Sequence, residues 1–266
     1  MPLLSAEGKL LVRNIIFLGL AFSSVIAHFF TSPSIQKVFR QNLTPFSANK
    51  VLLLFYFLAQ MLSFAGMSAP LYFVQGEADE VVMAANKSIL FISIFIFGWT
   101  FAWTGRSMVW SALLSLFMFS QASRMYFRNV RMHKGPVFYT TVKLPSKMFF
   151  AFSIWLLVYT MSAFFDCKSL PCRVFSNVMI WFIAGAYLVP IFAFYDATLA
   201  FLSSYIFFSM GVGQVMISLF TLQYVFAFLL SIILAVVGVG ALFMPKRTPA
   251  SPAGDVEQAP LLNDSA

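Results

Sequence analysis

Long apolar stretches follow one another through almost the whole chain, and this feature restricts the possible fold more than any other. Each stretch is about 16 to 24 residues long, close to the ~20 residues that a helix needs to cross a bilayer. Helices satisfy their own backbone polar groups, as the bilayer interior requires. The sequence predicts about eight transmembrane helices, at residues 11–30, 51–74, 88–104, 108–127, 148–165 and 174–195 and at two segments divided near residue 220 within 198–243.

The composition indicates the same fold class. Of the 266 residues, 61% are hydrophobic and 10% are charged, whereas about a quarter of the residues in a soluble domain are charged. We therefore predict an all-α, polytopic membrane bundle at residues 1–244. Residues 245–266, which are rich in Pro, Ala, Asp and Ser, are predicted to be a disordered cytosolic tail. The net charge of +8 does not indicate nucleic-acid binding, because the basic residues lie between the spans, where they direct membrane topology.

The positions of the basic residues predict the orientation of the chain in the membrane. With eight spans, both termini lie on one side, and that side carries more of the 17 Lys and Arg residues than the other side. The loop at 128–147 contributes most of the difference. Cytosolic loops are enriched in Lys and Arg, so both termini are predicted to be cytosolic.

A very short connection joins the third and fourth spans. Only residues 105–107 separate them, which predicts two antiparallel neighbouring helices. Trp99, Trp103 and Trp110 flank this connection, and the first two lie one helical turn apart on the same face. Tryptophan is enriched where membranes meet water, so all three side chains are predicted to be interfacial anchors.

The two cysteines of the chain, Cys167 and Cys172, fall in the loop between the fifth and sixth spans. The charge distribution places this loop on the non-cytosolic side, where disulfide bonds persist. Residues 168–171 separate the two cysteines and leave enough chain to close a small ring. We predict a disulfide bond, and two unpaired thiols are the alternative.

Four amides and one proline inside the spans form the candidate polar site. Gln60 lies in the second span, Asn177 lies near the start of the sixth, and Gln214 lies in the seventh. Gln223 lies early in the eighth span, and Pro190 is expected to kink the sixth, because proline removes a helical hydrogen bond. An amide in hydrocarbon seeks a partner on another helix, a contact worth about 0.6 to 2 kcal/mol. These residues either join helices together or line a polar pocket for a small solute.

The tail contains a sequence typical of a sorting signal. Glu257 lies four positions before Leu261 and Leu262, the arrangement of acidic dileucine signals that clathrin adaptors bind in cytosolic tails. An extended segment offers a groove one carboxylate and two apolar anchors. If the signal is used, the protein resides in a vacuole, a lysosome or a late endosome.

Two stretches resemble a fungal family of multi-span membrane proteins of unknown function. The first is Asn-Leu-Thr-Pro-Phe-Ser at residues 42–47, followed by Gln60 in the second span. The second runs from Gly-Val-Gly-Gln at residues 211–214 through residues 222–228. The resemblance implies a eukaryotic endomembrane protein and carries no established activity.

The sequence contains no catalytic, nucleotide-binding or metal-binding motif above background, and no cofactor is predicted. Ionisable residues inside spans are functional candidates by default, but Asp166 and Asp196 fall at span ends and His28 lies near one. We predict a non-enzymatic protein that organises membrane components, with the lipid bilayer and a clathrin adaptor as partners. The alternative is a small-solute transporter or channel with a polar site between the second, sixth and seventh spans.

Overall fold

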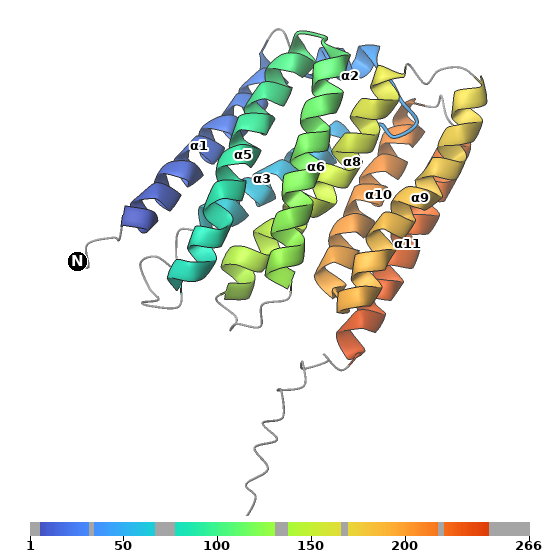
Figure 1. Ribbon diagram of the computed structural model, residues 1–266. Helices are drawn as coiled ribbons and strands as arrows, with labels where there is room; N and C mark the ends of the chain where they lie inside the picture. Colours follow the sequence, from blue (N-terminus) through green and yellow to red (C-terminus); the bar gives the residue numbers. More distant parts are fainter. Residues whose placement is uncertain are drawn as a thin grey trace, which may run out of the picture.

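The chain folds into a bundle of helices that lie side by side (Figure 1). The computed structural model describes residues 6–31, 35–66, 78–130, 138–165, 170–217 and 221–244, and the regular structure in these ranges is helical. The elements are α1 (Ala6–Phe30), α2 (Ile35–Gln41), α3 (Lys50–Gly66), α5 (Ala78–Thr104), α6 (Met108–Val130), the π-helical turn η1 (Tyr139–Lys143), α8 (Leu144–Phe164), α9 (Leu170–Phe194), α10 (Ala197–Ile217) and α11 (Thr221–Phe243).

The membrane-protein prediction is confirmed at the level of fold class. Among the described residues, six helical segments are long and apolar enough to cross a membrane, and they lie in α1, α5, η1 with α8, α9, α10 and α11. α3 is apolar but has only 17 residues, and α6 carries the polar residues Gln121, Arg124 and Arg128. The predicted division near residue 220 is confirmed, because α10 ends at Ile217 and α11 begins at Thr221.

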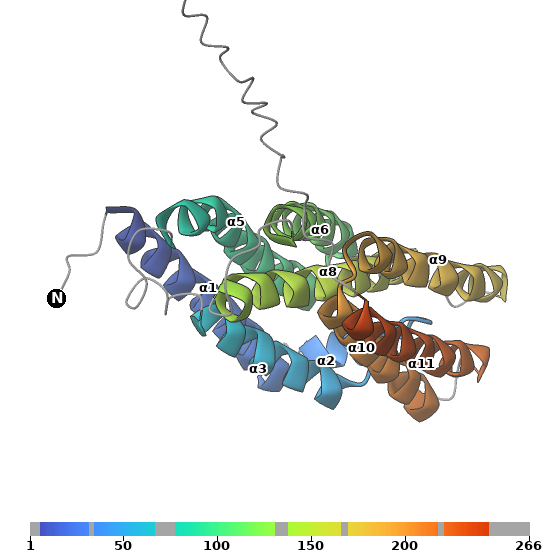
Figure 2. The ribbon, with the colours of Figure 1, turned by 90° about the horizontal axis from the view of Figure 1, so that it is seen from below.

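Helix α8 forms the centre of the bundle. The view from below shows it between the row of α5, α6 and α9 and the row of α3, α10 and α11 (Figure 2). Most of its residues are buried, and its apolar residues surround the helix instead of forming one stripe. A helix that is hydrophobic on all sides is typical of an interior position. Its neighbours α6, α10 and α3 pack directly against it.

The short connection between α5 and α6 is confirmed as a tight antiparallel turn. Arg106 adopts a left-handed conformation with φ 60°, and the amides of Gly105 and Ser107 donate to the carbonyls of Phe101 and Ala102, both at 2.8 Å. Such bonds satisfy the last carbonyls of a helix. The two helices that this turn joins pack along their length.

The predicted interfacial position of Trp99 and Trp103 is wrong. Their side chains are 4% and 0% exposed, and their rings stack with centroids 5.5 Å apart. Trp103 also packs against Phe39 of α2 and Tyr159 of α8. The face of α5 that carries both tryptophans is turned towards the core, so aromatic packing replaces anchoring. Trp110 differs, since it is exposed on the outside of α6.

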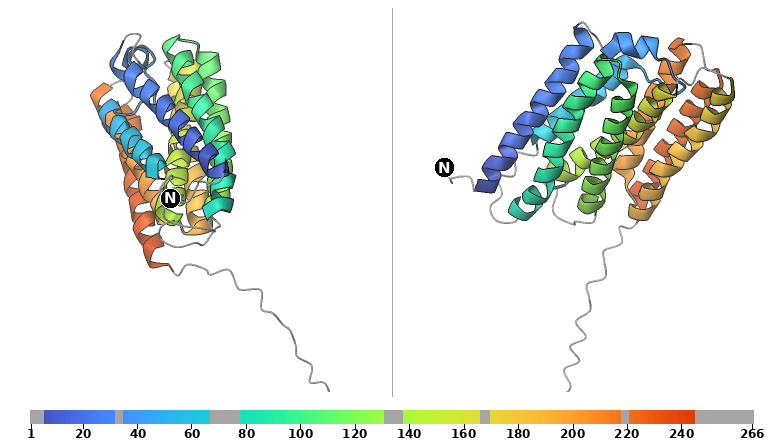
Figure 3. Two further views of the ribbon diagram at one scale, coloured as in Figure 1. Left: turned by 90° about the vertical axis from the view of Figure 1, so that its left-hand side faces the viewer. Right: turned by 45° about the horizontal axis from the view of Figure 1, so that its top comes forward.

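The first and last helices place the two ends of the described chain on one face of the bundle. α1 begins and α11 ends at the same end of the molecule (Figure 1, Figure 3). The start of α5, the end of α6 and the start of α8 lie at this end too (Figure 1). The predicted tail at 245–266, with Glu257, Leu261 and Leu262, lies outside the described residues, as does Cys167.

Candidate functional site

Residues 42–49, between α2 and α3, form a non-helical segment that enters the bundle, and we call it the inserted loop. The segment is rich in polar residues, yet it is buried instead of lying at the surface. Thr44, Phe46 and Ser47 are 1%, 3% and 4% exposed, respectively. Asn49 at its end caps α3, since its Oδ1 accepts hydrogen bonds from the amides of the second and third following residues.

Side chains of distant helices satisfy the carbonyls of the inserted loop. Tyr159 donates its hydroxyl to the carbonyl of Asn42 at 3.2 Å, and Trp155 donates Nε1 to the carbonyl of Phe46 at 3.0 Å. Gln214 donates Nε2 to the carbonyls of Thr44 and Ser47, each at 3.0 Å. Irregular backbone at membrane depth is tolerated only where protein or water satisfies its polar groups. α8 and α10 supply those partners here.

The inserted loop also approaches α10 very closely. The amide of Asn49 donates to the carbonyl of Ser209 at 2.8 Å. A Cβ added to Gly213 would lie 2.6 Å from the carbonyl carbon of Ala48, closer than real side chains allow. Any side chain at position 213 would therefore clash with the backbone of the inserted loop, and only glycine fits there. The two stretches that carry the family resemblance, residues 42–47 and 211–214, thus bind one another.

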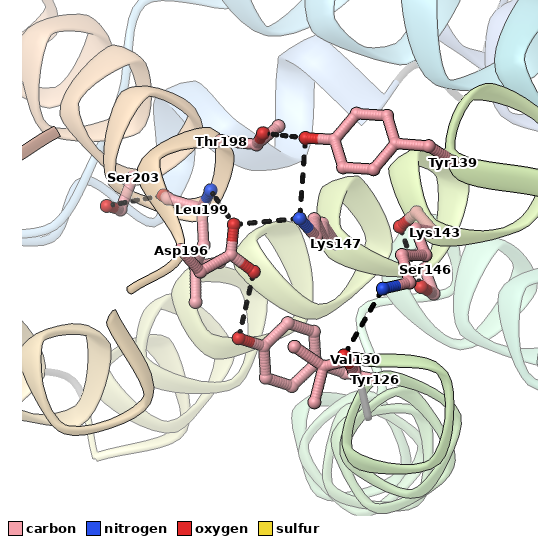
Figure 4. Close-up of polar contacts among 10 residues, drawn as sticks. All are labelled: Tyr126, Val130, Tyr139, Lys143, Ser146, Lys147, Asp196, Thr198, Leu199 and Ser203. Atoms are coloured by element: carbon pink, nitrogen blue, oxygen red, sulfur yellow. Dashed lines mark hydrogen bonds and ion pairs between the residues drawn. The ribbon is translucent and has the colours of Figure 1, made fainter. Parts of the chain in front are cut away.

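A second buried polar group, which we call the charged cluster, lies where α6, η1, α8 and α10 meet. It consists of Tyr126, Tyr139, Lys147, Asp196 and Thr198 (Figure 4). Lys147 Nζ lies 2.8 Å from Asp196 Oδ1, and their side chains are 7% and 2% exposed. Tyr126 donates its hydroxyl to Asp196 Oδ2 at 3.1 Å, and Lys147 donates to the Tyr139 hydroxyl at 3.4 Å. The Tyr139 and Thr198 hydroxyls bond to each other.

Asp196 gains its position from the turn between α9 and α10. Tyr195 adopts a left-handed φ of 49°, which lets the chain reverse. Asp196 then caps α10, since its Oδ1 accepts the amide of Leu199 at 3.1 Å. A buried ion pair is tolerated when hydrogen bonds satisfy its remaining polar atoms, and the capping amide and Tyr126 do so for the carboxylate.

Sequence reasoning placed Asp196 at a span end but missed Lys147 as its partner. The apolar run begins at Met148, so the sequence predicts that Lys147 belongs to the basic loop at 128–147. The structure instead places it in the first turn of α8. One signal was available, because the eight-span topology puts Lys147 and Asp196 at the same membrane surface.

The predicted polar residues of the spans do not form one site. Gln60 on α3 is fully buried, and both of its amide atoms lack a hydrogen-bond partner in the described part of the chain. Gln214 is engaged by the inserted loop through Nε2, while its Oε1 has no partner there. Pro190 is buried inside α9, and the helix continues through it to Phe194.

The structure does bring Asn177 and Gln223 together. Gln223 Nε2 on α11 donates to Asn177 Oδ1 on α9 at 2.6 Å. Asn177 also lines a groove of about 800 Å³ on the outer side of these helices. Its lining residues are Val174, Asn177, Val178, Trp181, Phe182, Gly185, Ala186, Val189, Leu222 and Phe226, and we call it the α9–α11 groove.

Comparisons with known proteins agree with the resemblance seen in the sequence. A family model described as "Fungal protein of unknown function (DUF1774)" matches residues 173–262. The uncharacterised protein C637.03 of Schizosaccharomyces pombe is 37% identical over 262 residues, which cover 98% of this chain and 97% of that protein. No solved structure matches the chain. The identity extends over nearly the full length of both proteins, and the chain therefore belongs to this fungal family of unknown function.

Proposed function

We propose that the protein is a non-enzymatic, multi-pass endomembrane protein that organises membrane components. The observation that carries this proposal is how the interior polar groups are used. The carbonyls of the inserted loop accept hydrogen bonds from Trp155, Tyr159 and Gln214, and the carboxylate of Asp196 is bound by Lys147 and Tyr126. These groups hold the bundle together, and the apolar α9–α11 groove lies open on the outside of the described helices. Such an arrangement suits binding within the membrane.

We further propose that the chain crosses the membrane eight times with both ends in the cytosol. The 17 residues of α3 extend only about 25 Å at 1.5 Å per residue, less than the ~30 Å hydrocarbon core. The buried inserted loop extends this passage. α6 has 23 residues, enough to cross, and packs along α5 and α8.

A small-solute transporter or channel is the second candidate function. The charged cluster favours it, because ionisable residues within membrane helices often mark ion or solute pathways. The fully buried amide of Gln60, which has no partner among the described residues, also favours it, because a solute or water could satisfy that amide.

Flux through proteoliposomes distinguishes the two functions. Purified full-length protein is reconstituted and tested with protons, monovalent cations, amino acids and sugars. The organiser proposal expects flux equal to that of protein-free vesicles. Solute flux that Gln60→Leu abolishes, in a variant with unchanged thermal unfolding, would overturn it. Gly240→Leu is the matched control, since a Cβ at Gly240 meets no atom within 4 Å.

The proposed compartment is a vacuole or a late endosome, reached through a clathrin adaptor that binds Glu257, Leu261 and Leu262. The family match extends to residue 262 and so includes this segment. Changing both leucines to Ala in a protein tagged internally should move it to another membrane. Unchanged localisation by fluorescence microscopy would remove the adaptor from the proposal.

A further inference from the structure

We propose that the α9–α11 groove binds a sterol, with the sterol hydroxyl held by Asn177 and Gln223 and the ring system lying along α9. This inference names a membrane component for the proposed organiser and rests on that function. Three features of the groove support it: the nature of its walls, the position of its polar end and the hydrogen-bonding capacity left at that end.

The groove is almost entirely apolar. Asn177 is the one polar residue among those that line it, and no charged residue is among them. Its volume of about 800 Å³ lies in the range of ~300 to 1,000 Å³ that is usual for ligand sites. From Val174 to Val189 it follows α9 for about 22 Å at 1.5 Å per residue. A long, uncharged, apolar molecule fits these dimensions, whereas a phosphate headgroup would find no cation among the described residues that line the groove.

The walls of the groove suit a rigid ligand. Trp181 and Phe226 pack edge to face with ring centroids 5.6 Å apart and form an aromatic wall between α9 and α11. Gly185 and Ala186 lack bulk where they line the groove. A fused ring system loses little conformational freedom on binding, whereas a flexible acyl chain must be ordered. This difference favours a sterol over a diacyl lipid.

The polar end lies near the start of the apolar span. Asn177 is three residues inside the span Val174–Phe194, about 4.5 Å along the helix. It is half-buried, and Gln223 is 2% exposed. A lipid with a single small polar group places that group near the membrane surface and its body in the hydrocarbon. The groove has the same polarity along its axis.

The Asn177–Gln223 bond leaves both a donor and an acceptor. Gln223 Nε2 occupies Asn177 Oδ1, so the amide nitrogen of Asn177, which bonds to no other described residue, remains to donate. Gln223 is not among the lining residues. Its Oε1 is buried beside the Asn177 amide and has no partner among the described residues, a costly state that a donor entering the groove at Asn177 would relieve. A hydroxyl accepts and donates at once. The sterol hydroxyl therefore complements both atoms, while its methyl ether or ketone could only accept.

Photolabelling tests the proposal on the full-length protein in nanodiscs. A sterol probe with a diazirine and a terminal alkyne is cross-linked with and without unlabelled sterol, and labelled peptides are mapped by mass spectrometry. We expect competed labelling within residues 174–189 and 222–226. The sterol methyl ether should compete about tenfold less well, the expected effect of leaving one buried acceptor unsatisfied. Equal competition by the ether, or competed labelling elsewhere only, would overturn the proposal.

A variant that fills the groove gives an independent test. A Cβ at Gly185 meets no atom within 4 Å, so Gly185→Leu should fold and reduce specific labelling at least tenfold. Gly240→Leu adds the same side chain to α11 at a site that is equally open and should label normally. If Gly185→Leu lowers the unfolding temperature, its loss of labelling is not used. The peptide map and the methyl-ether competition, both made on the unsubstituted protein, then test the sterol proposal.

Two other occupants would contradict the sterol. A photoreactive diacyl lipid that labels the groove as strongly as the sterol probe would assign it to bulk lipid. A partner helix would appear as a cross-link from a photoreactive residue at Phe182 to another polypeptide, undiminished by added sterol. Failure of the proposed function looks different, because solute flux dependent on Gln60 would overturn the organiser while leaving the sterol map unchanged.

Discussion

At the scale of single residues, the charged cluster shows how membrane helices hold buried charge. Lys147 and Asp196 are both almost inaccessible and lie 2.8 Å apart. Taking one charge away leaves the other buried without compensation, a change that costs about 3 to 5 kcal/mol, whereas removing both can be nearly neutral. Asn retains the capping ability of Asp at the start of α10, so neutralisation can be separated from loss of the cap.

Lys147→Met alone is therefore expected to destabilise the protein by about 3 to 5 kcal/mol. The double variant Lys147→Met with Asp196→Asn should recover most of this loss, because no unpaired charge remains. Thermal unfolding in detergent measures both. Lys9→Met, at an exposed position, is the control and should leave the transition unchanged. A double variant no more stable than Lys147→Met would contradict this account of the ion pair.

Gly213→Ala is expected to destabilise the protein by about 1 to 3 kcal/mol, the usual cost of forcing extra volume into a packed core. The reason is the 2.6 Å approach of its Cβ to the carbonyl carbon of Ala48, which is backbone and cannot move aside. The unfolding temperature should fall for Gly213→Ala and stay level or rise for Gly185→Ala, whose Cβ meets nothing. Equal behaviour of the two variants would mean that the inserted loop yields easily.

At the scale of elements, apolar run length predicted the long helices but neither the short α2 nor the inserted loop. Residues 42–49 read as a polar connection, because Asn42, Thr44, Ser47 and Asn49 dominate the segment. Their burial depends on donors such as Trp155 and Gln214, more than a hundred residues away in sequence. The sequence predicts that the Gln214 side chain bonds to another helix. In the structure it bonds instead to carbonyls of the inserted loop. An amide within an apolar run indicates that the side chain needs a hydrogen-bond partner, but the sequence does not show which backbone group supplies it.

The predicted disulfide between Cys167 and Cys172 would join the chain after α8 to the start of α9, and it can be tested with a thiol reagent. Cys172 lies in α9, and Cys167 precedes it in the connection after α8. Maleimide–polyethylene glycol added to denatured protein should shift its gel mobility only after reduction, if the two sulfurs are bonded. Cys167→Ser should free Cys172 and give one shift without a reducing agent. Labelling of both cysteines before reduction would favour the two unpaired thiols.

At the scale of the whole molecule, the helices fix which connections share a surface. The end of α6, the start of α8 and the end of α11 lie at one end of the bundle, and the end of α8 and the start of α9 lie at the other (Figure 1). The excess of basic residues at 128–147 predicts that the first end faces the cytosol. Run length could thus predict the order of the long helices, while the packing of α8 at the centre required the structure; the orientation that charge indicates stays a prediction.

Engineered protease sites give the decisive measurement of this topology, in sealed vesicles whose cytosolic face points outward. Sites placed within residues 131–137 and within residues 245–250 should both be cut by protease added to the cytosolic face, since α6 and α11 end at the same surface. A site placed at residues 168–169 should be cut only after the membrane is permeabilised. Cleavage of the first two sites from opposite faces would require an odd number of crossings between them, and the eight-pass arrangement would then be wrong even though each helix is correctly placed.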